Sequence, residues 1–239
     1  MWRVLLLAST SIKQIGGYTG PVMGQSTDCD DAQSRLEVDW NLSDFTVFTC
    51  GKDYPLPILE VDDLQFEIPN FDPRTDEVAH KCMNESIEYS ETPPLRGEHR
   101  PNWPEYGEYL YVPVQRWLHN LEHGSVVLLY HPCVDPAELN KLRLLIRGCL
   151  FRHIITPYRN LSEQRPLALV TWGAKLEMSS VQPEKVVAFV RKHGRVAPED
   201  ISRQGKYNLF LLKPAVVVSD HDDSQLCPHF NQFNDSTAQ

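Results

Sequence analysis

The fold is decided by the stretch from Ser125 to Pro157, which has the sequence SVVLLYHPCVDPAELNKLRLLIRGCLFRHIITP. It begins and ends with runs of Val, Leu and Ile, which are typical of buried strands. Between these runs, Asp135 and Pro136 mark a helix start, with the Asp as N-cap and the Pro at the first helical position. The apolar residues that follow at helical spacing are Leu139, Leu142, Ile146, Cys149 and Leu150. The stretch therefore predicts a strand, a helix and a second strand.

Similar signals continue on both sides of this unit. Runs rich in Tyr, Val and Leu predict strands at Glu108–Val114, Pro166–Trp172 and Tyr207–Val218, and shorter strands at Phe45–Thr49 and Leu64–Ile68. A second main helix begins near Pro183 and ends at Gly194, since glycine commonly follows the last helical turn. Strands interleaved with two main helices predict an α+β fold with a mixed or antiparallel sheet.

Charge is distributed unevenly along the 239 residues, which have a net charge of −9. Residues 28–98 carry 18 acidic and only 5 basic side chains and include a proline-rich stretch. We expect a signal peptide at 1–24, an acidic, loop-rich region at 25–91, the α+β domain at 92–218 and a polar tail at 219–239. The acidic charge argues against a nucleic-acid partner. No apolar run approaches the roughly 18–20 residues of a membrane-spanning helix, so we expect no transmembrane span.

Three features indicate the secretory pathway. The first residues, MWRVLLLASTS, place one cation before a short apolar run and small residues, as secretory signals do. Six cysteines without a Cys-x-x-Cys pair are typical of disulfides in an oxidising compartment. Four Asn-x-Ser sequons are candidate glycosylation sites. We expect an extracellular or lumenal protein, and a cytoplasmic protein is the alternative. The cysteines are Cys29, Cys50, Cys82, Cys133, Cys149 and Cys227, and the sequons begin at Asn41, Asn84, Asn160 and Asn234.

We predict that Cys133 and Cys149 do not pair with each other. They flank the predicted helix from Pro136 to Arg147, whose ends are roughly 16–18 Å apart at a rise of about 1.5 Å per residue. A disulfide holds its two Cα atoms only about 4.4–6.8 Å apart. Each of the two cysteines must therefore pair with one of the other four or stay free, and the spacing does not choose among these partners.

The segment with the most chemistry is Trp117–Gly124, with the sequence WLHNLEHG. Residues four apart project from one face of a helix or of an extended strand, so His119 and His123 share a face. Two imidazoles on one face are half of a typical transition-metal site, and Glu122 lies beside them. The candidate ligands are His99, His119 and His123, with His131 as a fourth, and the candidate cofactor is a transition-metal ion such as zinc. The alternatives are histidines that only hydrogen-bond around a turn, and metal-free acid–base chemistry.

The same segment contains the His-x-x-Glu-His arrangement of the inverted zinc proteases. In those enzymes both histidines hold zinc and the glutamate activates a water molecule, all on one helix. Under this interpretation Val114–His123 is helical and Glu122 is the catalytic residue. A third ligand would come from one of the downstream acids Glu177, Glu184 and Glu199. Because the pattern is short and those enzymes use larger domains, a metal-dependent hydrolase or redox enzyme is the alternative function.

Several stretches together resemble one known family. They are Thr92-Pro-Pro94, Gly97-Glu-His99, Tyr111–Gly124 and Pro166–Gly173. They are similar to the p53-inducible protein 13 family, whose uncharacterised domain also occurs in many bacterial membrane-anchored proteins, and the resemblance covers about residues 92–200. It implies secretory or plasma-membrane association, a growth-restraining role in the animal members and no established enzyme activity. The animal members resemble type I membrane proteins, whereas no C-terminal span is expected in this chain.

The leading hypothesis is a secreted or lumenal, non-enzymatic protein that binds an unidentified protein partner and holds a structural metal at His99, His119 and His123. Other prominent residues have simpler interpretations. We expect the carboxylate pairs Asp62-Asp63 and Asp222-Asp223 to lie on the solvated surface. The tryptophans expected to pack in the core are Trp103, Trp117 and Trp172.

Overall fold

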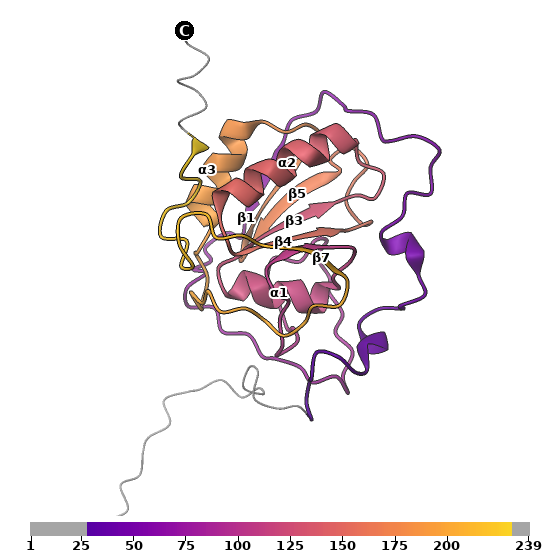
Figure 1. Cartoon of the computed structure of the whole chain (residues 1–239), viewed down its shortest axis with the longest axis vertical. Helices are drawn as coiled ribbons and strands as arrows, with labels where there is room; N and C mark the ends of the chain where they lie inside the picture. The colour runs from indigo at the N-terminus through magenta and orange to yellow at the C-terminus, as the bar shows by residue number, and fades with distance from the viewer. Residues whose placement is uncertain (1–27, 231–239) are drawn as a thin grey trace, which may run out of the picture.

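The structure, a computed structural model, describes residues 28–230 and is built on a seven-stranded sheet. The strand order is β1-β6-β5-β3-β4-β2-β7, with parallel and antiparallel pairs, which confirms the predicted α+β fold and mixed sheet. Helix α1 covers one face of the sheet, and helices α2 and α3 cover the other (Figure 1). The strands are β1 (Leu64–Glu67), β2 (Gly107–Tyr109), β3 (Val126–Tyr130), β4 (His153–Pro157), β5 (Leu167–Thr171), β6 (Ala174–Met178) and β7 (Leu211–Pro214). The helices are α1 (Val114–Glu122), α2 (Pro136–Cys149) and α3 (Pro183–His193), with 3-10 turns η1 (Leu36–Val38) and η2 (Phe45–Val47).

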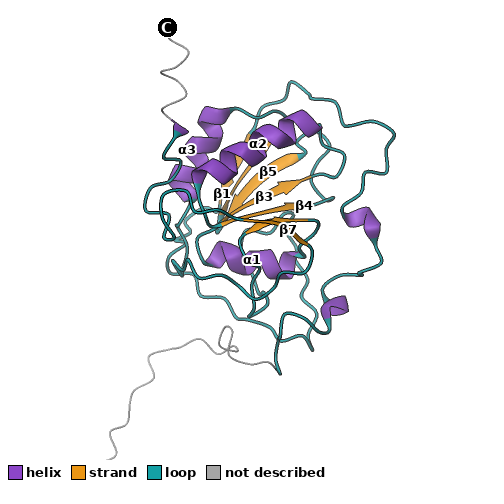
Figure 2. Cartoon of the chain, viewed as in Figure 1, coloured by secondary structure: helices purple, strands orange, loops and turns teal. Residues whose placement is uncertain are grey.

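The unit β3-α2-β4 forms the centre of the molecule (Figure 2). β3 and β4 pair in parallel, with α2 as the connection between them. The Asp135 carboxylate accepts hydrogen bonds from the backbone N–H groups of Ala137 and Glu138, as an N-cap does. Along β3, alternate residues belong to the cores on the two faces of the sheet, Val127 with α1 and Val126 with α2 and α3. Burial on both faces explains why the strand is apolar at every position.

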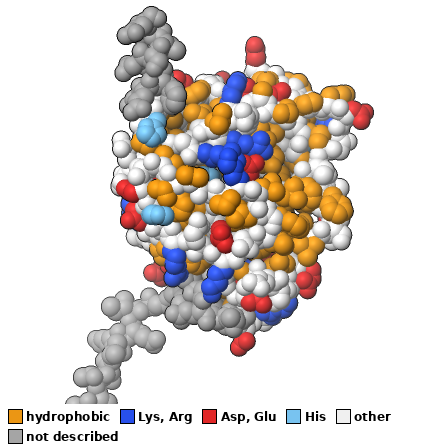
Figure 3. Space-filling view, viewed as in Figure 1, with side chains coloured by type: hydrophobic (Ala, Val, Ile, Leu, Met, Phe, Trp, Pro, Cys, Tyr) orange, Lys and Arg blue, Asp and Glu red, His pale blue; other side chains and the backbone are white. Residues whose placement is uncertain are grey.

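Basic side chains gather on the surface over α2 (Figure 3). Two of them connect the helix to the sheet. The Arg143 guanidinium lies 2.9 Å from Glu108 of β2, and Arg147 donates a hydrogen bond to the same carboxylate. Because Glu108 is buried, these cations supply the counter-charge that its ionised form requires.

Three of the predicted strands are absent or shorter in the structure. The predicted strand at Phe45–Thr49 is wrong, because the Asp44 side chain caps η2 by accepting from the Thr46 N–H. β2 ends at Tyr109, and Val114, the last residue of the predicted strand, is instead the first residue of α1. The last strand is only Leu211–Pro214, which pairs with β2 at the edge of the sheet. The predicted core tryptophans Trp103, Trp117 and Trp172 are all buried.

The six cysteines form three disulfides, Cys29–Cys82, Cys50–Cys133 and Cys149–Cys227. Cys133 and Cys149 do not pair with each other, which confirms the prediction, and α2 separates them. Three disulfides are typical of an oxidising compartment and indicate an extracellular or lumenal protein. In the part of the chain that the structure describes, none of the helices has both the length and the apolarity that a membrane span requires.

The described part of the acidic region, residues 28–91, packs against the sheet and α1 and supplies one strand. β1 joins the sheet beside β6, and the disulfide Cys29–Cys82 closes a loop next to α1. Asp30 accepts two hydrogen bonds from Arg116 of α1, at 2.5 and 2.9 Å, and both side chains are fully buried. Asp39 accepts two from the buried Arg100, at 2.8 and 2.6 Å. Part of the acidic charge therefore neutralises buried arginines.

The segment after Ser219, predicted as a polar tail, is held against the core. Its Cys227 is bonded to Cys149 at the end of α2. Asp223 is fully buried, so its predicted place on the solvated surface was wrong. Its carboxylate accepts hydrogen bonds from the backbone N–H groups of Phe151 and Arg152 and from the buried Arg152 side chain. The predicted signal peptide and the sequon at Asn234 lie outside the described residues.

We predict that Asp30→Ala lowers the free energy of unfolding by about 3–5 kcal/mol, because it leaves the Arg116 guanidinium buried without its carboxylate. Chemical denaturation with the disulfides intact measures the change. Asp28→Ala is the control, because it removes the same charge from an exposed position two residues away and is expected to change stability by less than about 0.5 kcal/mol. Equal effects of the two substitutions would contradict the importance of the buried pair.

Candidate metal centre

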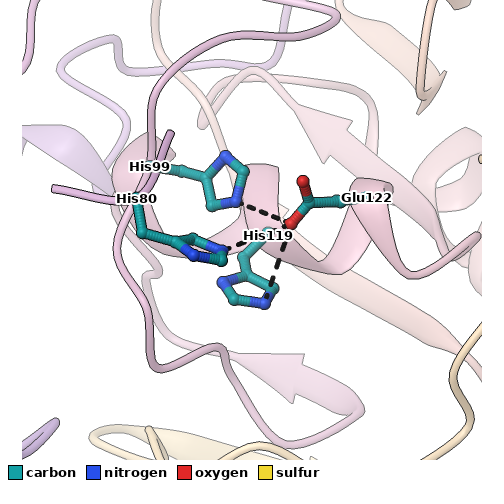
Figure 4. Close-up of side chains that lie close together, drawn as sticks. All are labelled: His80, His99, His119 and Glu122. Atoms are coloured by element: carbon teal, nitrogen blue, oxygen red, sulfur yellow. Dashed lines mark hydrogen bonds and ion pairs between the residues drawn. The ribbon is translucent and has the colours of Figure 1, made fainter. Parts of the chain in front are cut away.

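Three imidazoles and one carboxylate converge beside α1 (Figure 4). His119 and Glu122 are three residues apart on α1 and therefore neighbours on its surface. His99 lies between the acidic region and β2, and His80 lies in the acidic region, in an isolated β-bridge with His99. One donor atom of each of these four residues lies within 4.8 Å of the others, and all four residues are buried.

The Glu122 carboxylate is close to all three rings. Its Oε2 lies 2.9 Å from His99 Nε2, 3.4 Å from His80 Nε2 and 3.9 Å from His119 Nε2. Zinc binds nitrogen and oxygen at about 2.0–2.2 Å, so neighbouring ligand atoms of a tetrahedral site are about 3.3–3.6 Å apart. The three distances bracket this spacing, so the four residues could together hold one transition-metal ion.

Backbone carbonyls determine which nitrogen carries the proton in two of the rings. His99 Nδ1 lies 2.8 Å from the Gly97 carbonyl oxygen, and His119 Nδ1 lies 2.6 Å from that of Arg100. A carbonyl oxygen can only accept, so each Nδ1 donates and the Nε2 of each neutral ring presents a lone pair. His99 Nε2 then faces the carboxylate across 2.9 Å, as a donor if the ring is protonated and with a lone pair if it is neutral. Two acceptors at this distance require a cation between them, either a proton or a metal ion. Metal-ligating histidines characteristically donate their second N–H in this way.

Burial and the neighbouring charges set the protonation states. Burial lowers the pKa of His119 well below its ordinary value, and His123, His99 and His80 lower it further. Burial also acts to raise the pKa of Glu122, but the interactions with His99 and His80 outweigh it and hold that pKa below its usual range. An ionised carboxylate and a neutral imidazole are the forms that bind metals.

A second group adjoins the first on the other side of His119. His123 Nε2 lies 3.1 Å from His119 Nε2 and 3.1 Å from Glu199 Oε2. The donor atoms of Glu122, His123 and Glu199 also lie within 4.8 Å of one another. Burial lowers the pKa of His123, and the Glu199 carboxylate partly opposes this shift. The Glu199 side chain is 36% exposed, whereas His123 is fully buried.

A close approach of two chain segments positions Glu199. Its backbone N–H donates to the Glu122 carbonyl, and the Arg195 N–H donates to the Gly124 carbonyl at 2.8 Å. Gly124 has a φ of +79°, and a Cβ atom at this position would lie 2.8 Å from the Arg195 Cα. Glycine is therefore required where α1 ends, since only glycine adopts this conformation without strain and leaves room for Arg195.

Several residues singled out in the sequence lie in this cluster or beside it. The structure brings the predicted His99 and His119 together with Glu122 and puts His123 beside them. His131 lies elsewhere, where its Nδ1 accepts a hydrogen bond from the Cys133 N–H. His80 was missed, because it lies in the acidic region, far in sequence from the other histidines, and the sequence analysis assigned its neighbour Cys82 to a disulfide. Of the three downstream acids, Glu199 reaches this centre, whereas Glu177 lies on β6 and Glu184 lies in the first turn of α3.

Comparison with known proteins gives a family but no activity. The family model described as "Protein of unknown function (DUF3105)" matches residues 80–205, a range that begins at His80 and includes Glu199. Tumor protein p53-inducible protein 13 of Mus musculus is 30% identical over 71 residues, which are 30% of this chain and 18% of that relative. The matched part thus spans less than a fifth of the relative's length. No solved structure matches the chain significantly.

We predict that Gly124→Ala lowers the free energy of unfolding by about 2–4 kcal/mol, from left-handed backbone strain and the contact with Arg195. Gly148→Ala is the control, because Gly148 lies in α2 with nothing within 4 Å of an added Cβ atom. That substitution is expected to stabilise the protein by about 0.5–1 kcal/mol through its higher helix propensity. Chemical denaturation measures both, and a neutral Gly124→Ala would contradict the close approach.

Proposed function

The chain belongs to the DUF3105 family of proteins of unknown function, and we propose that it is a secreted or lumenal metal-binding protein that acts by binding rather than by catalysis. A divalent transition-metal ion such as zinc would be held by His80, His99, His119 and Glu122. The observation that carries this proposal is the buried His99 Nε2, which faces the Glu122 carboxylate across 2.9 Å. A metal ion between the two would satisfy both groups.

The ligand set supports a structural role for the ion. Four protein ligands complete a tetrahedral site, whereas catalytic zinc usually has three and keeps one position open for water. The four ligands also come from three separate parts of the chain, so a bound ion would cross-link the acidic region, the segment around His99 and α1. Binding free energy at such a site stabilises the fold.

The alternative is a metal-dependent hydrolase or redox enzyme that uses the His-x-x-Glu-His motif. It would need Glu122 free to activate a water molecule. The Glu122 oxygen lies instead within 2.9–3.9 Å of three imidazole nitrogens. This position favours Glu122 as a ligand and supports the binding function over the enzymatic one.

The proposal also includes a compartment and a regulatory role. The three disulfides support passage through the secretory pathway, with residues 1–24 as the signal peptide. The name of the mouse relative describes it as p53-inducible, and its similarity over 71 residues is the basis on which we propose a regulatory, growth-restraining role for this chain. Such a role would be exercised through a protein partner.

We predict that the chain, purified from a secretory host, binds one zinc ion in the buried site. At free zinc about 1,000-fold above Kd, binding should stabilise the fold by about 4 kcal/mol. Metal analysis, competition with a chromophoric chelator and thermal unfolding measure the stoichiometry, the affinity and the stabilisation.

The variants His80→Ala and His99→Ala are expected to weaken zinc binding by about 100-fold or more, since each removes a ligand. His229→Ala is the control, because His229 is an exposed histidine outside both groups. Wild-type protein that binds no zinc, or variants that bind it as tightly as the control, would refute the proposed function.

We also predict N-linked glycans at Asn41, Asn84 and Asn160 in protein from a glycosylating secretory host. All three asparagines are exposed, so an oligosaccharide can be attached without unfolding the chain. Peptide mapping before and after enzymatic deglycosylation identifies the modified asparagines, and Asn→Gln variants are the controls. A secreted chain that is unmodified at all three positions would contradict this prediction.

A further inference from the structure

We propose that Glu122, His123 and Glu199 form an outer metal position, through which an ion passes from solvent to the buried site. This inference rests on the proposed metal-binding function. It concerns how the ion arrives and assigns a role to two residues, His123 and Glu199, that the buried site does not use.

The four ligands of the buried site have little contact with solvent. His99 and His119 are 0% exposed, and His80 and Glu122 are 4% exposed. An ion from water must lose its hydration shell before it reaches these atoms, and a group nearer the surface that replaces part of that shell would lower the cost of entry. Of the six residues in the two groups, Glu199 is the one with substantial exposure, at 36% of its side chain.

Donor atoms lead in short steps from Glu199 to the interior. Glu199 Oε2 lies 3.1 Å from His123 Nε2, and that nitrogen lies 3.1 Å from His119 Nε2. His119 Nε2 lies 3.9 Å from Glu122 Oε2, which belongs to the buried site. Each step is close to the spacing of neighbouring ligand atoms around one ion, about 3.3–3.6 Å for tetrahedral zinc. The ion can therefore exchange one ligand at a time and is never left without protein ligands.

The ligands of the outer and buried positions differ in a way that favours transfer of the ion inward. The outer position offers one imidazole and two carboxylates, which balance a divalent charge and leave a place for water at the exposed end. The buried position offers three imidazoles and one carboxylate, a complete four-ligand set for a transition metal. Glu122 is shared by the two sets, so it holds the ion while the other ligands change.

The outer position is supported by packing. The Glu199 N–H donates to the Glu122 carbonyl at 3.1 Å, so the backbone fixes Glu199 beside the end of α1. The Trp103 ring stacks on His119, with centroids 4.8 Å apart, and meets the edge of His123 at 4.5 Å. The backbone therefore fixes the position of Glu199, and the Trp103 ring fixes the positions of His119 and His123.

The test measures the kinetics of metal loading in the full chain, with Co²⁺ or Zn²⁺ mixed rapidly with chelator-treated protein. Glu199→Gln is expected to slow both association and chelator-driven release by about 10-fold, with one ion still bound per chain and Kd changed much less than either rate. Glu98→Gln is the matched control. Glu98 is also a half-exposed glutamate, with 50% of its side chain accessible, and it precedes the ligand His99 in the chain. Circular dichroism and thermal unfolding verify that both variants fold.

The outcomes separate this inference from the proposed function. If the wild-type protein binds no ion, the proposed function fails and the inference with it. If the wild-type protein binds one ion and Glu199→Gln loads as fast as Glu98→Gln, or both variants are equally slow, the inference is overturned and the proposed function stands. If the wild-type protein holds two ions and Glu199→Gln holds one, the outer position carries a resident ion and the transit role is overturned.

Discussion

The arrangement of this protein depends on the burial of one carboxylate, that of Glu122, near the C-terminus of α1. A buried ionised carboxylate is costly without a nearby cation. The end of a helix makes it costlier, because the last carbonyl groups carry partial negative charge. Cationic or metal-binding groups must therefore reach Glu122 from elsewhere in the chain. The segments that carry His80 and His99 bring such groups to Glu122, while the buried pairs of Asp30 with Arg116 and of Asp39 with Arg100 hold the acidic region in place.

Arg100 couples two of the ligands. Its backbone carbonyl accepts the Nδ1–H of His119, which orients that ring. Its buried guanidinium donates to the Lys81 and Cys82 carbonyls at 3.1 and 2.5 Å, and so holds the segment that follows His80. The disulfide from Cys82 closes the same segment. A single arginine thus positions one ligand through its backbone and another through its side chain, and its own charge is balanced by Asp39.

Sequence reasoning succeeded where the decisive information was local. The N-cap at Asp135, the apolar stripe of α2 and the spacing of His119, Glu122 and His123 all depend on residues within one helix. The separation of Cys133 from Cys149 followed from the length of that helix. The sequence did not predict the burial of residues whose partners are distant in the chain. His80 pairs with Glu122, and Asp223 pairs with Arg152. The residues adjacent to His80 and Asp223 in sequence do not indicate their burial, because each residue meets its partner only in the folded chain.

The His-x-x-Glu-His motif at His119–His123 has a different geometry here from the one it has in the inverted zinc proteases. In the hydrolase arrangement both histidines hold one ion and the glutamate stays free. Here His123 is the C-cap of α1, and the chain turns at Gly124 so that the segment from Arg195 to Glu199 can approach. His123 consequently lies between His119 and Glu199, while the Glu122 carboxylate lies beside His80 and His99. The turn at Gly124, rather than the spacing of the histidines, determines which donors lie at the surface and which are enclosed.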